Sequence, residues 1–311
     1  MITPVESPAT IHHTQSEGRG MLYVLITALL WSTTGTVQTL GPAGIDPLVV
    51  GPLRICIGGV LIWLWSRALG QGTQSRWSPT LVLIGAVTVA GYQLAFFSAV
   101  QLTGVVVSTI TSIGTTPIFA GFLSRLVLKE RLRPIWYAAT ALSIGGVVLL
   151  ASADGTAELN MAGLWLATLA GASYAGQTVV IRRLVRFHPP EMVMARLFLV
   201  ASLLVLPLLV LRPMGWMWSV HGVGTVLYLG VVPTSIAYIF FSKGLRSVEG
   251  ATVSTISLAE PASAALLGVF LLGEVIPVRG VVGIVLISIS LVMITVAAVI
   301  RARSGLPRPV R

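Results

Sequence analysis

The segment ISLAEPASAALLG, residues 256–268, places one carboxylate, Glu260, in the middle of an apolar run. No Lys or Arg lies within ten positions on either side, so neighbours on a helix cannot neutralise the charge. A charge at the centre of a membrane span costs about 2.5 kcal/mol or more, unless it faces water, pairs, or holds a proton. Glu260 is therefore a candidate proton-coupling or substrate-amine site. The alternative is a protonated or hydrogen-bonded glutamate that fixes its helix beside a kink at Pro261.

Two arginines also lie within apolar stretches, Arg54 seven residues after Pro47 and Arg196 seven residues after Pro189. At 1.5 Å per residue, each lies about 10 Å along a helix that begins at the proline. Long side chains reach the membrane interface from that depth, which favours a gating or anchoring role through a salt bridge. The alternative is that a guanidinium binds a substrate carboxylate.

Glutamates and prolines recur at matching positions. Glu130 and Glu274 each lie thirteen residues after a proline, Pro117 and Pro261 respectively. An acidic residue near a helix N-terminus is favourable by itself, so a structural role is expected for both glutamates. Proline inside a helix removes a backbone hydrogen bond, so Pro117 and Pro261 are candidate kinks or hinges.

A further set of polar and aromatic residues falls at the middle of apolar stretches. Lipid offers such groups no hydrogen-bond partner, so we expect them to face the interior of a helix bundle. A cavity lined by aromatic rings and a few polar groups suits a neutral amphiphile, whereas helix-to-helix packing is the alternative role. The candidate substrate-binding residues are Trp31, Ser32, Thr34, Tyr92, Gln93, Tyr174, Gln177, Tyr238 and Ser242.

The elements that must position these residues are membrane spans. Of the 311 residues, 55% are hydrophobic and only 10% are charged, against about 25% charged in a soluble domain. Mean hydropathy is +0.92. Continuous apolar runs of about 20 residues predict helices rather than a β-barrel. The ten predicted spans are 21–40, 47–65, 80–101, 104–127, 134–152, 162–181, 190–211, 222–242, 250–272 and 277–300.

Charge predicts the orientation. Of the 20 Lys and Arg, Arg54 and Arg196 lie in spans, and only Arg212 and Arg279 fall on the side opposite the N-terminus. This bias predicts cytoplasmic N- and C-termini in a bacterial-type inner membrane. The basic residues lie in short loops, which argues against nucleic acid as the reason for the net charge of +10. We expect polar or basic cytoplasmic tails at 1–19 and 301–311, without a signal peptide.

The two halves of the chain repeat. Two similar segments lie 144 positions apart: PIFAGFLSRLVLKE at 117–130 and PASAALLGVFLLGE at 261–274. Trp31 and Tyr174 lie 143 positions apart. The predicted repeats are residues 20–152 and 160–300. Each holds five spans, an odd number, so the second must be inverted, as in many transporters that open alternately to either side. We expect spans one, three, four, six, eight and nine to line a central cavity.

This layout resembles the drug/metabolite transporter superfamily, in particular its EamA-domain members. The segments that carry the resemblance are LLWSTTGTV, PLRICIGGVLI and YIFFSKGLRSVEGATVSTISLAEPASAALLGVFLLGE, within a match over about residues 20–300. The resemblance implies ten helices in two inverted repeats. It also implies a transporter of small organic solutes, similar to exporters of aromatic and other neutral amino acids. TTP at 115–117 stands where the second repeat has AEP, so the carboxylate of Glu260 is not duplicated.

Other classes find less support. The sequence holds no GxxxxGK[ST], HExxH or CxxC motif and one cysteine, so we expect no enzyme activity, cofactor, catalytic residue or metal site. A carrier for a drug cation, sugar or nucleoside remains an alternative, as does a non-transporting membrane receptor or assembly factor. The expected partners are a small-molecule substrate and membrane lipid. One chain already holds both inverted halves, so we expect a functional monomer.

Overall fold

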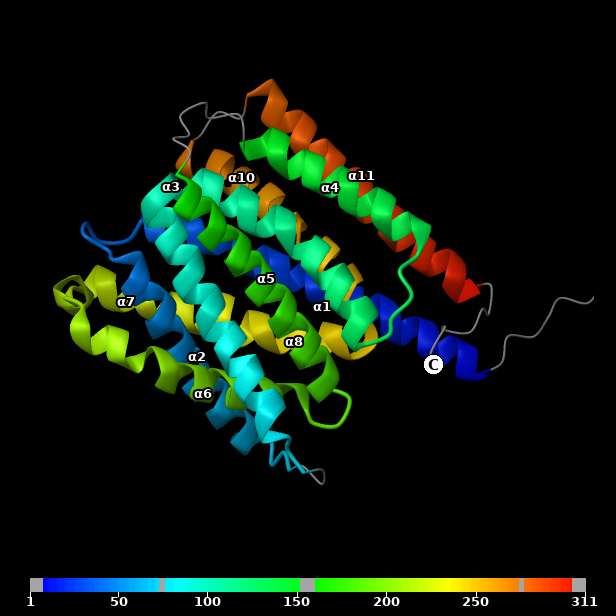
Figure 1. Cartoon of the computed structure of the whole chain (residues 1–311), viewed down its shortest axis with the longest axis horizontal. Helices are drawn as coiled ribbons and strands as arrows, with labels where there is room; N and C mark the ends of the chain where they lie inside the picture. The colour runs from blue at the N-terminus through cyan, green and yellow to red at the C-terminus, as the bar shows by residue number, and fades with distance from the viewer. Residues whose placement is uncertain (1–7, 73–75, 152–159, 274–276, 304–311) are drawn as a thin grey trace, which may run out of the picture.

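The computed structural model describes residues 8–72, 76–151, 160–273 and 277–303 (Figure 1). Within these ranges every regular element is a helix and no strand occurs. Glu274 and the outer parts of both predicted tails, 1–7 and 304–311, lie outside the described residues. The chain is thus an all-helical membrane protein, as predicted.

The helices follow the predicted spans closely. Nine described segments are long and apolar enough to cross a membrane, and the remaining predicted span, 134–152, contains a shorter apolar helix. The elements in order are α1 (Pro8–Thr39), α2 (Pro47–Ala68), α3 (Pro79–Val127), α4 (Pro134–Ala151), α5 (Met161–Leu184), α6 (Pro190–Leu211), the 3-10 helix η1 (Gly215–Trp218), α7 (Val220–Gly230), the π-helix η2 (Val231–Ile236), α8 (Ala237–Ser247), α9 (Gly250–Ile256), α10 (Ala259–Leu272) and α11 (Val278–Arg303).

Proline and short polar residues set where several helices begin. α2 starts at Pro47, where the fixed backbone angle favours a first helical position, and Asp46 accepts a hydrogen bond from the Leu48 N–H at 2.9 Å. α5 starts after Asn160, whose side chain accepts from Gly163. α1 begins already at Pro8, so part of the polar tail predicted at 1–19 is helical.

Gly104 divides the long α3. Its backbone angles, φ 76° and ψ 167°, are not helical, and φ lies in the range that favours glycine. The two halves on either side correspond to the spans predicted at 80–101 and 104–127. Two spans therefore follow each other almost without a loop, which is the shortest connection within the first repeat.

Packing between helices shows the symmetry of the inverted repeats. α1 packs against α8 and α10, and its counterpart α5 packs against both halves of α3. The counterparts α2 and α6 pack on each other, and so do α4 and α11, which lie side by side along the opposite edge of the bundle (Figure 1). The pairs α2–α6 and α4–α11 thus join counterparts from the two repeats, as expected for repeats related by a pseudo-two-fold axis.

Small residues allow α4 and α11 to approach closely. A Cβ added at Gly146 would lie 2.6 Å from the backbone oxygen of Gly283 and 2.8 Å from a side-chain carbon of Ile287. The hydroxyls of Ser143 and Ser290 hydrogen-bond across the same interface. Small residues and hydroxyl pairs are the usual contacts between helices in lipid, where no hydrophobic effect drives association.

The eighth span is interrupted by the π-helix η2. Pro233 has no N–H to donate, and the hydroxyls of Thr234 and Ser235 donate to the carbonyls of Leu229 at 2.6 Å and Gly230 at 2.7 Å. Such single π turns often accompany functional sites. Here the turn brings Thr234 against α2.

The ninth span breaks between α9 and α10. Pro261 lies in the first turn of α10, where its missing N–H removes no helical hydrogen bond, so it begins a helix rather than kinking a continuous one. Glu260 lies in the same turn, at the end of the helix where a negative charge is favourable.

Candidate functional site

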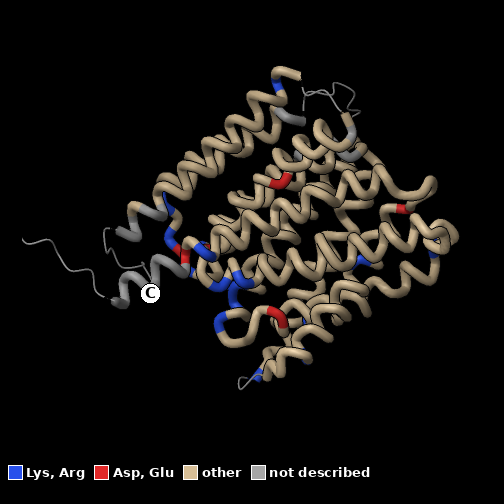
Figure 2. Tube along the Cα trace, turned by 180° about the vertical axis from the view of Figure 1, so that it is seen from behind, with Lys and Arg blue, Asp and Glu red and all other residues tan. Residues whose placement is uncertain are grey.

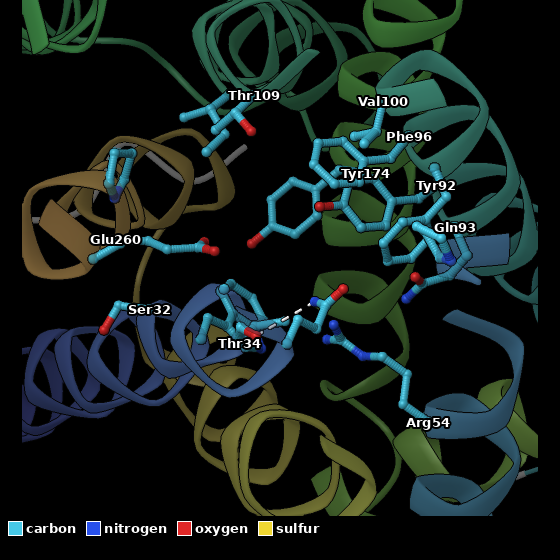
Figure 3. A pocket seen from close by; sticks show the side chains of 18 of the residues that line it. Ser32, Thr34, Arg54, Tyr92, Gln93, Phe96, Val100, Thr109, Tyr174 and Glu260 are labelled. Carbon is cyan, nitrogen blue, oxygen red and sulfur yellow. Dashed lines mark hydrogen bonds between the residues drawn. The ribbon is translucent and has the colours of Figure 1, made fainter. Parts of the chain in front are cut away.

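A cavity of about 480 Å³ lies between helices of both repeats (Figure 3). Its walls come from α1, α2, both halves of α3, α5, α8 and α10, so α2 joins the helices expected to line it. The predicted site residues that line it are Trp31, Ser32, Thr34, Arg54, Tyr92, Gln93, Tyr174, Tyr238, Glu260 and Pro261. The structure therefore brings together most of the predicted polar and aromatic set.

Aromatic rings close one end of the cavity. The ring centroid of Trp31 lies 5.8 Å from that of Tyr174, 5.1 Å from Tyr238 and 5.2 Å from Phe241. We call these four residues the aromatic floor. The indole Nε1 of Trp31 is buried and has no hydrogen-bond partner among the described residues.

The opposite end of the cavity reaches the turn between α1 and α2. Thr39 and Pro47, which flank that turn, line the cavity. Thr39 lies eight residues beyond Trp31, or about 12 Å along α1. The cavity thus runs from the middle of the bundle to the end at which α1 stops.

Several lining residues were missed by sequence reasoning. Helical spacing could have found several of them. Phe96 follows Tyr92 by four residues, for example, and Gln38 follows Thr34 by four, which places each pair on one helix face. The rings of Tyr92 and Phe96 stack with centroids 5.7 Å apart. The unpredicted lining residues are Gly35, Gln38, Thr39, Pro47, Phe96, Phe97, Val100, Thr109, Ile113 and Ala264.

Two predicted substrate-binding residues, Gln177 and Ser242, do not line this cavity. Gln177 is buried at 1% exposure, and the Ser242 hydroxyl donates to the Ile239 carbonyl within its own helix. Ser32 lines the cavity, but its hydroxyl donates to the carbonyl of Leu29 at 2.7 Å. These hydroxyls are therefore already satisfied by their own helices.

Glu260 directs its carboxylate into the cavity, and Arg54 directs its guanidinium into it from another wall (Figure 3). Neither forms an ion pair among the described residues. Arg54 Nε donates to the hydroxyl of Thr234 at 3.0 Å. One negative and one positive charge therefore face the same cavity.

The far end of the bundle is tied by ion pairs that the sequence could not predict. Arg182 Nε lies 3.0 Å from the carboxylate of Glu130, and Arg182 also donates to the carbonyl of Leu245. Lys243 pairs with Glu191 at 2.9 Å. The Arg182–Glu130 pair links the two repeats, and the Lys243–Glu191 pair joins α8 to α6 within the second repeat. Pro117, in the second half of α3, does not line the cavity.

Arg196, the counterpart of Arg54, has a different environment. It lies over the ring of Trp77 at 4.3 Å, and Trp77 stacks on His188 with centroids 3.7 Å apart and planes 5° apart. Burial, together with the charge of Arg196, lowers the pKa of His188 below its ordinary value. The lowered pKa favours the neutral imidazole of His188 in this stack.

Comparisons with known proteins agree with this architecture. A model of the EamA-like transporter family matches residues 18–152 and 161–296. The chain is 41% identical to "Uncharacterized transporter YwfM" of Bacillus subtilis, over 89% of the chain and 93% of that protein. It is 26% identical to "Aromatic amino acid exporter YddG" of Ancylobacter novellus, over 77% of the chain and 84% of the relative.

A solved structure shares the fold at a TM-score of 0.79 and 24% identity, covering 90% of this chain and 97% of the other. Two matches of one family model, one in each half, fit the repeat seen in the packing. The chain belongs to the EamA-like transporter family of the drug/metabolite transporter superfamily, and it is a multi-pass membrane transporter.

Proposed function

We propose that this transporter exports amino acids or related amphiphilic metabolites by alternating access, as a secondary carrier. The cavity is the observation that supports this most strongly. Its size suits a small organic solute, its aromatic lining suits an apolar side chain, and its few charged and polar groups suit a zwitterionic head. A relative named as an aromatic amino acid exporter is consistent with this substrate class.

The charge distribution supports an orientation for the molecule. Most Lys and Arg gather at one end of the bundle, near the beginning of α1 (Figure 2). Basic residues favour the cytoplasmic side, so we assign that end to the cytoplasm of a bacterial-type cell, with both termini there. The cavity reaches the other end, so the described conformation is open to the outside and closed to the cytoplasm.

Closure at the cytoplasmic end has two components in this proposal. The aromatic floor blocks the pathway at mid-depth, and the Arg182–Glu130 and Lys243–Glu191 pairs hold helices together beneath it. Opening to the cytoplasm requires both to rearrange while the outer end closes. One chain holds both halves of the pathway, so a monomer suffices for transport.

Glu260 is the residue that we assign to proton coupling. It lies in the cavity without an ion-pair partner among the described residues, where it can exchange a proton with water from the open side. Neutralisation by Glu260→Gln should abolish any response of transport to a pH gradient. Coupling that persists unchanged in this variant would refute the assignment.

The test of the proposed function is flux in proteoliposomes. Labelled L-phenylalanine, L-tryptophan and L-leucine would be measured with and without an imposed pH gradient, against protein-free vesicles. Gradient-driven uphill flux is the expected result.

A cationic solute is the second candidate, because Glu260 is the anionic group that faces the cavity among the described residues. Competition by a drug cation but by no amino acid would favour that candidate, and absence of any flux would contradict transport of these classes.

A further inference from the structure

Arg54 is a buried cation that forms no ion pair in the part of the chain that the structure describes, although Glu260 faces the same cavity. The exposed fraction of Arg54 is 8%, and no described acidic side chain lies within ion-pair distance of it. Its one hydrogen bond within this part is the bond from Nε to Thr234, so its terminal nitrogens remain free to face the cavity. A buried charge is unfavourable unless an opposite charge or strong hydrogen bonds compensate it.

The side chain of Arg54 is held in place. Thr234 is 0% exposed, and its hydroxyl donates to the Leu229 carbonyl, which leaves the oxygen free to accept from Nε of Arg54. Gly58, one turn further along α2, allows this approach, because a Cβ there would lie 2.5 Å from Thr234 Cγ2. The π-helix and the glycine together fix one edge of the guanidinium and leave the other edge for a ligand.

A second buried polar group in the same cavity also lacks a partner. Gln93 is 3% exposed and lines the cavity, and its Oε1 accepts no hydrogen bond from any described residue. Arg54 and Gln93 come from different helices, α2 and α3 (Figure 3). Buried polar groups without partners are rare in folded proteins, so a polar ligand would satisfy both.

The chemistry of that ligand follows from the groups present. A guanidinium presents two parallel N–H donors that match the two oxygens of a carboxylate. The carboxylate of Glu260 faces the same cavity and disfavours an anion with more than one charge. The surrounding rings favour an apolar remainder. A monocarboxylate with an apolar or aromatic side chain fits these three conditions.

We propose that Arg54, oriented by Thr234, forms the subsite that binds the carboxylate of the transported solute. This inference rests on the proposed function and names the part of the substrate that is recognised. Arg54 is thereby a specificity-determining residue rather than a gate. Its counterpart Arg196 has no such role, because it stacks on Trp77 outside the cavity.

The test is binding to the purified full-length protein by isothermal titration calorimetry. The three probes are L-phenylalanine, L-phenylalaninamide, which lacks the carboxylate, and 3-phenylpropionate, which lacks the ammonium group. We expect the wild-type protein to bind both carboxylates at least about tenfold more tightly than the amide. In Arg54→Gln this preference should disappear, while the amide binds as before.

Three further variants keep the test decisive if Arg54→Gln does not fold. Arg54→Lys retains the charge without the fork and should reduce the preference. Thr234→Val removes the acceptor of Nε and should also reduce it. The matched control Arg196→Gln should leave it unchanged. Equal binding of all three probes by the wild type, binding of none, or a full preference in Arg54→Gln would overturn the inference. The proposed function is tested separately by flux, so an Arg54 variant that keeps its preference leaves amino-acid transport standing.

Discussion

Trp31 of α1 and Tyr174 of α5 occupy equivalent positions in the two repeats, and their rings meet nearly edge to face with centroids 5.8 Å apart. Two equivalent residues can touch only near the pseudo-two-fold axis that relates the repeats. The aromatic floor therefore lies at the point where the two halves of the pathway exchange roles. In the proposed alternating-access cycle, a rearrangement of this one contact would affect both halves of the pathway.

The first prediction concerns the floor itself. We expect Trp31→Ala to lower the free energy of unfolding by about 3 to 5 kcal/mol and to reduce transport, because it removes a ring that contacts Tyr174, Tyr238 and Phe241. The variant Trp31→Phe should retain most of the stability and most of the transport activity. Denaturant unfolding and proteoliposome flux measure the two effects, and a stable, fully active Trp31→Ala protein would argue against a floor.

The second prediction concerns the Arg182–Glu130 ion pair. The Arg182 and Glu130 side chains are 7% and 8% exposed, so loss of one partner deprives the other buried charge of this ion pair. We expect Glu130→Gln or Arg182→Met alone to destabilise by about 3 to 5 kcal/mol. The loss of unfolding free energy in the double variant should be smaller than the sum of the losses in the two single variants. Denaturant unfolding of the four proteins gives the coupling, and strictly additive losses would show that the pair does not hold the closed end.

The third prediction concerns pH and the Trp77–His188 stack. Because burial and Arg196 lower the pKa of His188, the stacked state binds fewer protons than an opened state. The stabilisation is fully present above the ordinary histidine pKa of about 6.5, and it is lost as pH falls below that value. The variant His188→Phe keeps a stacking ring but cannot titrate. Thermal unfolding between about pH 5 and 8 should therefore vary less in His188→Phe than in the wild type, and identical pH profiles would exclude this contribution.

The fourth prediction concerns the interface between α4 and α11. Gly146→Ala places a Cβ 2.6 Å from the oxygen of Gly283, so the helices must move apart and stability should fall. The neighbouring Gly145 has nothing within 4 Å of such a Cβ. Gly145→Ala is therefore the matched control, with an expected gain of up to about 1 kcal/mol from helix propensity. Equal unfolding midpoints for the two variants would contradict the close packing at Gly146.

The sequence predicts the spans well because length and apolarity alone decide whether a segment crosses lipid. The offset between the halves also predicts the inverted repeat, which the packing of α1 and α5 confirms. The break at Gly104, whose φ and ψ are not helical, falls where the predicted spans 80–101 and 104–127 meet. The start of α1 at Pro8 was missed because a polar segment can continue a helix beyond the membrane.

The site was predictable only in part. Residue type indicates that a polar group avoids lipid, but it does not say whether the group faces a cavity or another helix. Gln177 and Ser242 were therefore grouped with Tyr174 and Tyr238, although only the two tyrosines line the cavity. The bond between Arg54 and Thr234 joins residues 180 positions apart, and no local pattern encodes it.

The central claim is that the cavity open at the α1–α2 end is the substrate pathway, and accessibility of an introduced cysteine tests it most directly. Thr109→Cys would be made with Cys56→Ser, which removes the native thiol, and Thr178→Cys would serve as the buried control. A membrane-impermeant maleimide applied from outside the cell should label position 109 but not 178, and L-phenylalanine should slow the labelling. Labelling only from the cytoplasmic side, or labelling that no transported solute slows, would contradict the account.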